Sequence, residues 1–462
     1  MGNFWDYKVW GFINLIAVLL LSLMAANALK KTIKALEKSL IPTSVLGGTI
    51  LLVIAGFYDL ITKTPLFETR FFGTNGYETL EIITYHTLAL GFIASTFKST
   101  RGKLTPKRAS EIFNTGLTTV STYLLQGFVG MGITIVAAFI IKDFFSASGL
   151  LVAFGFGQGT GQAMNYGNIY ETEYGFTGGK TFGLTIAALG FLCASFGGVI
   201  HLQMLKRKKK RVIGNGSDGE DFSMEEIQTK NEIPMQGSMD KMTVEVALVM
   251  ITYLLTYLII FWLGNLLPGM KSVIYGFNFL IGVLSAMLIK QVLKLLKRYS
   301  LSKKDYVNDF LMTRVSNFFF DLMVVAGIAA IRLGILKNYW GIMIILAVAG
   351  LIVTYWYNRF VSKILFREYR EEQFLMMFGM LTGTASTGTI LLREIDGEFK
   401  TPAADNMVYQ NFPAIAFGFP LMILATLAPK KPVLTFIILI VFYLVLNVIL
   451  FRSFLFKKRK KK

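Results

Sequence analysis

Long apolar stretches, separated by short polar connections, recur along almost the whole chain. A helix needs about 20 mostly apolar residues to cross the hydrocarbon core of a bilayer. About eleven stretches meet this requirement. They cover residues 10–28, 44–60, 82–97, 117–141, 179–203, 243–266, 273–291, 308–331, 338–358, 405–427 and 432–455. The pattern predicts an all-α integral membrane protein with about eleven transmembrane helices.

Two further stretches, 149–166 and 373–392, are apolar but interrupted by Gly, Thr and Ser. Backbone without regular hydrogen bonds is tolerated at membrane depth only where protein, water or a ligand supplies the missing partners. Broken helices of this kind are typical of transporters. We therefore expect each stretch to form a re-entrant hairpin, which enters the membrane and returns to the same side.

The two interrupted stretches resemble each other in sequence. Residues 154–161 read FGFGQGTG and align without a gap with 378–385, which read FGMLTGTA. Each copy follows four predicted spans and precedes one, and an odd number of spans inverts the second half. We predict a first inverted repeat over 1–204, a polar cytoplasmic linker over 205–242, a second repeat over 243–427, and an extra span with a basic tail over 428–462.

Composition and charge support this view. The chain is 54% hydrophobic and has a net charge of +19. Most of its Lys and Arg residues fall in connections on one side of the predicted map, which indicates the cytoplasmic side and places the N-terminus outside and the C-terminus inside. Basic runs beside apolar spans are topology signals, so we expect no nucleic-acid partner. One cysteine and two histidines argue against a disulfide framework or a zinc site.

The tips of the predicted hairpins carry the candidate solute site. Glycines allow backbone amides to approach a ligand, and hydroxyl and amide side chains can read a solute or bind a cation. The first turn of a helix also favours a carboxylate. Close helix packing is the alternative reason for small residues here. The candidates are Gln158, Gly159, Thr160, Gly161, Gln162, Asn165, Thr382, Gly383, Thr384, Ala385, Ser386 and Thr387.

Asp321 is an acidic residue within an apolar run. Insertion of an ionised carboxylate at the centre of a membrane helix costs at least about 2.5 kcal/mol. A bound sodium ion or a proton offsets this cost, whereas an interfacial position or pairing with Arg332 gives a structural alternative. We expect Asp321, Thr160 and Thr384 to contribute sodium ligands, with proton coupling left open.

Several short motifs resemble those of the bacterial sodium/glutamate symporters over residues 10–427. They are Ile41-Pro42 with Val45-Leu46-Gly47-Gly48, Ala89-Leu90-Gly91-Phe92, Gly159-Thr160-Gly161, and Tyr174-Gly175-Phe176-Thr177. The resemblance implies a bacterial inner-membrane protein that takes up an acidic amino acid with sodium. It further implies an elevator-type movement of a hairpin-bearing core, a homodimer, and no cofactor beyond the coupling ion.

Two positions depart from the pattern of that family. Gln158 occupies a place where the family is expected to have histidine, and residues 382–389 differ from the expected Gly-rich sequence of the second hairpin. Another organic anion or amino acid therefore stays open as the solute, with sodium or proton coupling. An ion channel is a further alternative, because re-entrant segments also build selectivity filters. No nucleophile, base and orienting group occur together, so we expect no enzyme.

Overall fold

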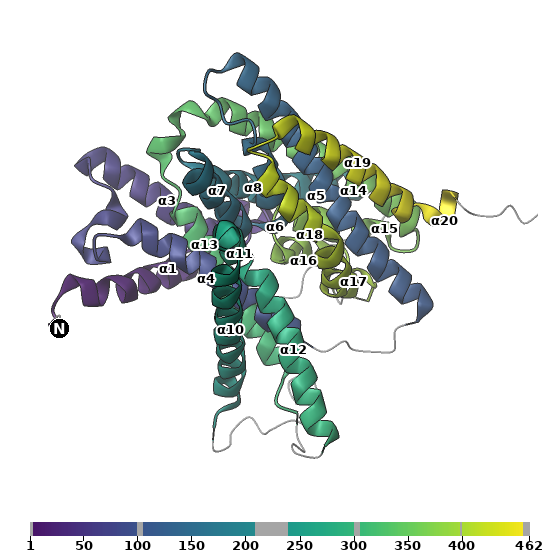
Figure 1. Cartoon of the computed structure of the whole chain (residues 1–462), viewed down its shortest axis with the longest axis horizontal. Helices are drawn as coiled ribbons and strands as arrows, with labels where there is room; N and C mark the ends of the chain where they lie inside the picture. Colours follow the sequence, from purple (N-terminus) through teal and green to yellow (C-terminus); the bar gives the residue numbers. More distant parts are fainter. Residues whose placement is uncertain (1–2, 99–104, 208–238, 300–304, 398–399, 456–462) are drawn as a thin grey trace, which may run out of the picture. The chain divides into compact units, whose positions relative to one another are not determined.

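The computed structural model describes residues 3–98, 105–207, 239–299, 305–397 and 400–455. The regular elements of this part are α-helices and short 3-10 helices (Figure 1). Most of the predicted linker 205–242 and the basic end of the chain lie outside the described residues.

Within the described residues, ten helices are long and apolar enough to cross a membrane. They are α1 (Tyr7–Thr32), α3 (Thr43–Thr62), α4 (Gly76–Phe97), α5 (Pro106–Ile140), α8 (Gly179–Arg207), α10 (Lys241–Leu266), α12 (Asn278–Arg298), α13 (Asp309–Ala329), α14 (Trp340–Leu365) and α19 (Pro432–Leu450). An eleventh span is formed if α17 (Ala403–Tyr409) and α18 (Asn411–Leu427), which are bent by 50°, count as one. All eleven predicted spans overlap these helices, which confirms a multi-pass membrane protein.

The remaining elements are short. The helices are α2 (Lys34–Lys38), α6 (Leu151–Gln158), α7 (Thr160–Tyr174), α11 (Lys271–Gly276), α15 (Arg370–Thr382), α16 (Ala385–Arg393) and α20 (Arg452–Leu455). The 3-10 turns are η1 (Leu66–Glu68), η2 (Arg70–Phe72), η3 (Ser148–Leu150), η4 (Pro268–Met270) and η5 (Leu333–Asn338).

The chain divides into two compact units. Unit 1 comprises Met1–Leu20, Phe67–Gly102 and Ser217–Ala326, and unit 2 comprises Leu21–Leu66, Lys103–Gly216 and Gly327–Lys462. Each unit draws helices from both predicted repeats. The predicted repeat boundaries stay a prediction.

Unit 1 contains α4, α10, α11, α12, the first part of α1 and most of α13. Helix α10 illustrates how its side chains suit a lipid environment. Thr252 and Thr256 are buried, and their hydroxyls donate to the carbonyls of Leu248 (2.7 Å) and Thr252 (2.8 Å). Leu254 and Trp262 point outward and are 59% and 63% exposed. Polar groups paired inside and apolar groups outside reverse the pattern of a soluble protein. The core consists of Leu90, Ile93, Ala94, Phe97, Val249, Ala286, Met312 and Val315.

Unit 2 is organised around α5, the longest helix at 35 residues. Helix α19 lies alongside α5 in Figure 1, and α6, α14 and α18 also pack against α5. Gly130 of α5 meets Gly149 of η3 backbone to backbone, since a Cβ on Gly130 would lie 2.2 Å from the Gly149 carbonyl oxygen. The missing side chains thus allow the start of α6 to lie directly against α5.

An ion cluster joins α8, α14 and α15 within unit 2. Arg359 donates from Nη1 and Nη2 to the two carboxylate oxygens of Glu371, at 2.5 and 2.8 Å, and His201 Nε2 lies 3.2 Å from Glu371 Oε2. Glu371 lies between the α14 span and the 373–392 stretch. Burial of Glu371 opposes ionisation, but the bonds from His201 and Arg359 outweigh it and lower the pKa from 4.5 to about 2. The cluster fixes the first turn of α15.

Replacement of Glu371 by Gln is expected to destabilise the protein. The variant removes the carboxylate that pairs with Arg359, and hydrogen bonds to charged groups contribute about 1.5 to 3 kcal/mol. The melting temperature in detergent at pH 7 should fall. Because the folded pKa is lowered, this stabilisation is present above about pH 4.5 and is lost as the pH falls toward 2. The wild-type melting temperature should therefore fall toward that of E371Q over this range.

Glu368→Gln is the matched control. Glu368 pairs with Lys107, and both side chains are largely exposed, so this variant should change the melting temperature little. Equal losses in the two variants would show that the Glu371 cluster has no special role.

Candidate functional site

The first predicted hairpin is a helix broken at Gly159. Helix α6 ends at Gln158, Gly159 has φ +83° and ψ −171°, and α7 begins at Thr160. This φ lies in a region that glycine adopts readily and other residues avoid. The two helices pack against each other. The break therefore ends α6, and the buried first-turn amides of α7 have no preceding turn to bond within the helix.

The second predicted hairpin is broken at the aligned position. Helix α15 ends at Thr382, and α16 begins at Ala385 after Gly383 and the N-cap residue Thr384. The Thr384 hydroxyl accepts a hydrogen bond from the Thr387 amide at 3.3 Å. Helices α15 and α16 also pack against each other. Gly159 and Gly383, which the sequence alignment pairs, thus both end a helix.

Gln126 of α5 connects the two breaks, and the sequence analysis missed it. Its Nε2 donates to the Leu381 carbonyl and to Thr354 Oγ1, both at 2.7 Å. The Leu381 carbonyl lies in the last turn of α15, where it has no partner further along the helix. Gln126 Oε1 would lie 3.3 Å from a Cβ on Gly157 in α6. One α5 side chain therefore reaches the ends of both α6 and α15.

Two buried amide atoms beside these breaks have no hydrogen-bond partner. They are Gln126 Oε1 and Gln162 Nε2, and both side chains are 1% exposed. Because a carbonyl only accepts, the bond to Leu381 fixes the orientation of the Gln126 amide. Gln162 Oε1 accepts from Asn165 Nδ2 at 3.3 Å, which leaves Nε2 as the donor without a partner. An unpaired buried polar group costs about 1 to 3 kcal/mol, and other buried atoms of unit 2, such as Asn358 Oδ1 and Asn406 Oδ1, are also unpaired. The position of Gln126 and Gln162 beside the two breaks is what distinguishes them.

The surroundings of the breaks are tightly packed. Thr160 is buried against Gly327, since a Cβ on Gly327 would lie 2.7 Å from Thr160 Cβ. On the other side, a Cβ on Gly190 of α8 would lie 2.6 Å from the Thr382 carbonyl oxygen. Helix α15 packs against both α6 and α8. Gly190 on α8 and Gly327 near the end of α13 thus allow these segments to lie close to the two breaks. Close helix packing is also the alternative reason for small residues given in the sequence analysis.

The predicted substrate residues fall into two groups within unit 2. One group lies at the α6–α7 break and comprises Gln158, Gly159, Thr160, Gly161, Gln162 and Asn165. The other lies at the α15–α16 break and comprises Thr382, Gly383, Thr384, Ala385, Ser386 and Thr387. Most members are buried, whereas Ala385 and Ser386 are exposed. Asp321, the predicted sodium ligand, is half-buried and belongs to unit 1.

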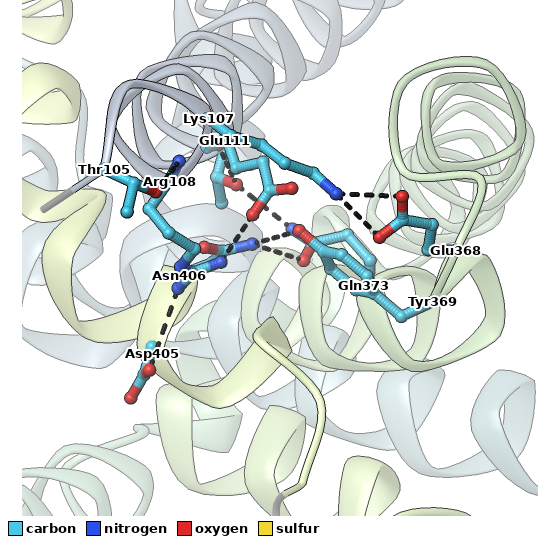
Figure 2. Close-up of polar contacts among 10 residues, drawn as sticks. Thr105, Lys107, Arg108, Glu111, Glu368, Tyr369, Gln373, Asp405 and Asn406 are labelled. Carbon is cyan, nitrogen blue, oxygen red and sulfur yellow. Dashed lines mark hydrogen bonds and ion pairs between the residues drawn. The ribbon is translucent and has the colours of Figure 1, made fainter.

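A second polar region of unit 2 lies at the start of α5 (Figure 2). Asn406 of α17 donates from Nδ2 to Tyr369 Oη (3.0 Å) and Gln373 Oε1 (3.1 Å), and Gln373 Nε2 donates to Thr115 Oγ1 (3.2 Å). On the outer side, Lys107 pairs with Glu368 at 2.8 Å (Figure 2). These contacts connect α5, α15 and α17. The sequence did not predict them, because the partners lie far apart along the chain.

Within the described residues, no group of three or more His, Cys, Asp or Glu side chains is arranged to hold a metal ion. Sodium is also bound by carbonyl and hydroxyl oxygens, which do not belong to that set. Oxygen ligands of this kind are present at both breaks.

Comparison with known proteins adds the family. A family model described as sodium/glutamate symporter matches residues 11–377, which is most of the chain. No curated protein matches the chain. Members of this family are transporters rather than enzymes, and membership implies symport of glutamate with sodium. The broken apolar helices, the many spans and the family match together lead to one conclusion: the chain belongs to the sodium/glutamate symporter family.

Proposed function

We propose that the protein binds glutamate, or a closely related acidic amino acid, between the helix breaks at Gly159 and Gly383. The observation that carries this proposal is the pair of buried, unpaired amide atoms, Gln126 Oε1 and Gln162 Nε2. One is an acceptor and the other is a donor. An amino acid offers both complements, because its ammonium group donates and its carboxylates accept.

Each group of the solute then has a partner. Gln162 Nε2 donates to one carboxylate, and the first-turn amides of α7 add the partial positive charge of a helix start. Gln126 Oε1 accepts from the ammonium group. The first turn of α16, where Ala385 and Ser386 are exposed, offers a second carboxylate site of the same kind. The remaining residues of the two predicted groups line these positions.

Sodium provides the driving force in this proposal. Thr160 and Thr384 contribute hydroxyl oxygens at the two breaks of unit 2. The carboxylate of Asp321 belongs to unit 1 and stays a separate prediction. The Thr384 hydroxyl lies 3.2 Å from that of Thr387, so two oxygens are already close together at the second break. A potential of 100 mV is worth about 2.3 kcal/mol for each charge moved inward. Cotransport of more than one sodium ion with an anion is therefore driven by the potential as well as by the sodium gradient.

The proposal also covers the arrangement of the repeats, the transport movement and the oligomeric state. The two broken helices are re-entrant hairpins of inverted repeats, and their aligned glycines, Gly159 and Gly383, each end a helix. A core that carries both hairpins moves as an elevator within a homodimer. The chain resides in a bacterial inner membrane, with its N-terminus outside and its C-terminus in the cytoplasm.

Uptake of labelled glutamate into proteoliposomes tests the coupling. An imposed sodium gradient should drive accumulation, whereas equal potassium or proton gradients should not, because only sodium occupies the proposed cation ligands. Accumulation under the proton gradient alone would contradict sodium coupling. Uptake of other organic anions in place of glutamate would change the solute, and single-channel currents would favour a channel.

Gln162→Glu should impair uptake strongly while the protein stays folded. The change keeps the size of the side chain and the acceptor for Asn165, but it replaces the unpaired donor by a negative charge that repels the solute carboxylate. Loss of a buried partner for a charged group costs about 2 to 5 kcal/mol, so kcat/KM for glutamate should fall about 30-fold or more.

Asn168→Asp is the matched control on the same helix, because Asn168 is exposed on α7. It should leave uptake close to the wild-type rate. Normal uptake by Q162E, or an equal loss in N168D, would remove Gln162 from the site.

Thr384→Val should abolish uptake, whereas Thr384→Ser should retain it. Valine keeps the shape but removes the hydroxyl that accepts from the Thr387 amide. Loss of an N-cap costs about 1 kcal/mol, which a protein of this size tolerates. The sodium concentration for half-maximal glutamate binding to the purified variants, measured alongside the melting temperature, separates loss of a sodium ligand from loss of the cap. Wild-type sodium dependence in T384V would show that function needs the Thr384 hydroxyl neither as the cap of α16 nor as a sodium ligand.

A further inference from the structure

A hollow lies where α14 ends and the chain turns into α15. Its volume is 510 Å³, and it is lined by Phe360, Lys363, Ile364, Arg367 and Arg370. All five residues belong to unit 2. Three of them are cationic and two are apolar, and no part of the proposed glutamate site contributes to the lining.

Among the described residues, basic groups outnumber carboxylates around the hollow, because the three lining cations, Lys107 and Arg359 lie near only Glu368 and Glu371. Lys363, Arg367 and Arg370 are all exposed. Glu368 is engaged by Lys107. Glu371 accepts both bonds from Arg359 and also forms an ion pair with Arg370, whose Nε lies 3.4 Å from Oε1. The Arg367 Nε donates to the Ile364 carbonyl at 3.3 Å, which holds its guanidinium at the rim of the hollow.

An apolar stripe on α14 leads directly to the hollow. Trp356 is 66% exposed and Phe360 is 55% exposed, and they follow other large apolar side chains that are half exposed or more. These residues recur at helical spacing on one face, which is the pattern of a surface covered by lipid. Exposed aromatic residues followed by basic residues are typical of the level where acyl chains meet headgroups. The stripe consists of Ile345, Val348, Ile352, Trp356 and Phe360.

We propose that this hollow binds the headgroup of an anionic phospholipid, whose acyl chains lie along the α14 stripe. The Arg367 and Arg370 guanidinium groups can each form paired hydrogen bonds with phosphate oxygens, and Lys363 adds a point charge. Phe360 and Ile364 contact the glycerol and the first methylenes. Basic pockets between membrane helices are a general mode of anionic lipid recognition. Because the hollow includes the first residue of α15, a bound lipid also restrains the start of that helix.

Lipid binding to the purified, delipidated protein tests the proposal. Native mass spectrometry in a neutral detergent gives affinities for phosphatidylglycerol and phosphatidylcholine. Each basic residue near a lipid surface contributes about 1 kcal/mol, or about fivefold in affinity. The double variant K363Q/R367Q should therefore bind phosphatidylglycerol about 25-fold more weakly, while its weak binding of phosphatidylcholine is unchanged.

The control K294Q/R298Q removes two exposed basic residues from the end of another span helix, α12. It should change phosphatidylglycerol affinity by about twofold or less. Equal losses in the two double variants would mean that the basic residues act only as general topology charges, which overturns the proposal.

A third variant tests the shape of the site with all charges retained. Ile364→Trp fills the hollow and should weaken phosphatidylglycerol binding at least about tenfold, a loss of about 1.4 kcal/mol. Inorganic phosphate at millimolar concentration should displace little lipid, because it lacks the acyl chains. Undiminished lipid binding by I364W, or full displacement by inorganic phosphate, would overturn the assignment. Melting temperatures near that of the wild type establish that each variant is folded.

Discussion

Every backbone amide and carbonyl within an apolar bundle needs a hydrogen-bond partner, and the two broken helices of unit 2 create groups that lack one. The structure meets part of this demand with its own side chains. Gln126 bonds the Leu381 carbonyl at the end of α15, and Thr384 caps the start of α16. The atoms left over, Gln126 Oε1 and Gln162 Nε2, lie beside the same breaks. The constraint that makes a broken helix costly thus also defines where a polar solute is stabilised.

The same constraint explains how α15 is held. In the first turn of α15, Glu371 binds Arg359 and His201, and Gln373 donates to Thr115 of α5. In the last turn, the Leu381 carbonyl accepts a hydrogen bond from Gln126 of α5. Any shift of α15 along α5 breaks these bonds together. These bonds therefore link α5, α8, α14 and α15 to one another within unit 2. The proposed elevator movement requires such links, because it moves a body as a whole.

The sequence predicted the spans well because lipid exposure imposes a long apolar run on every one of them. The predicted span 273–291 was displaced toward the N-terminus, because Lys271–Gly276 forms the separate helix α11 before α12 begins at Asn278. Each stretch that was predicted as a hairpin contains a helix break, at Gly159 and at Gly383, where glycine and hydroxyl residues interrupt the apolar pattern. The sequence did not predict the role of Gln126, because its partner Leu381 is 255 positions away. No local pattern distinguishes such a residue from other polar residues on a membrane helix.

A structure of the protein bound to sodium and glutamate tests the central claim most directly, because that claim concerns the position of one donor and one acceptor. The decisive quantities are the distances from the glutamate carboxylate to Gln162 Nε2 and from its ammonium group to Gln126 Oε1. The account predicts that both are hydrogen bonds, with separations of about 2.7 to 3.2 Å. Glutamate bound elsewhere, with both amide atoms still unpaired, would contradict it.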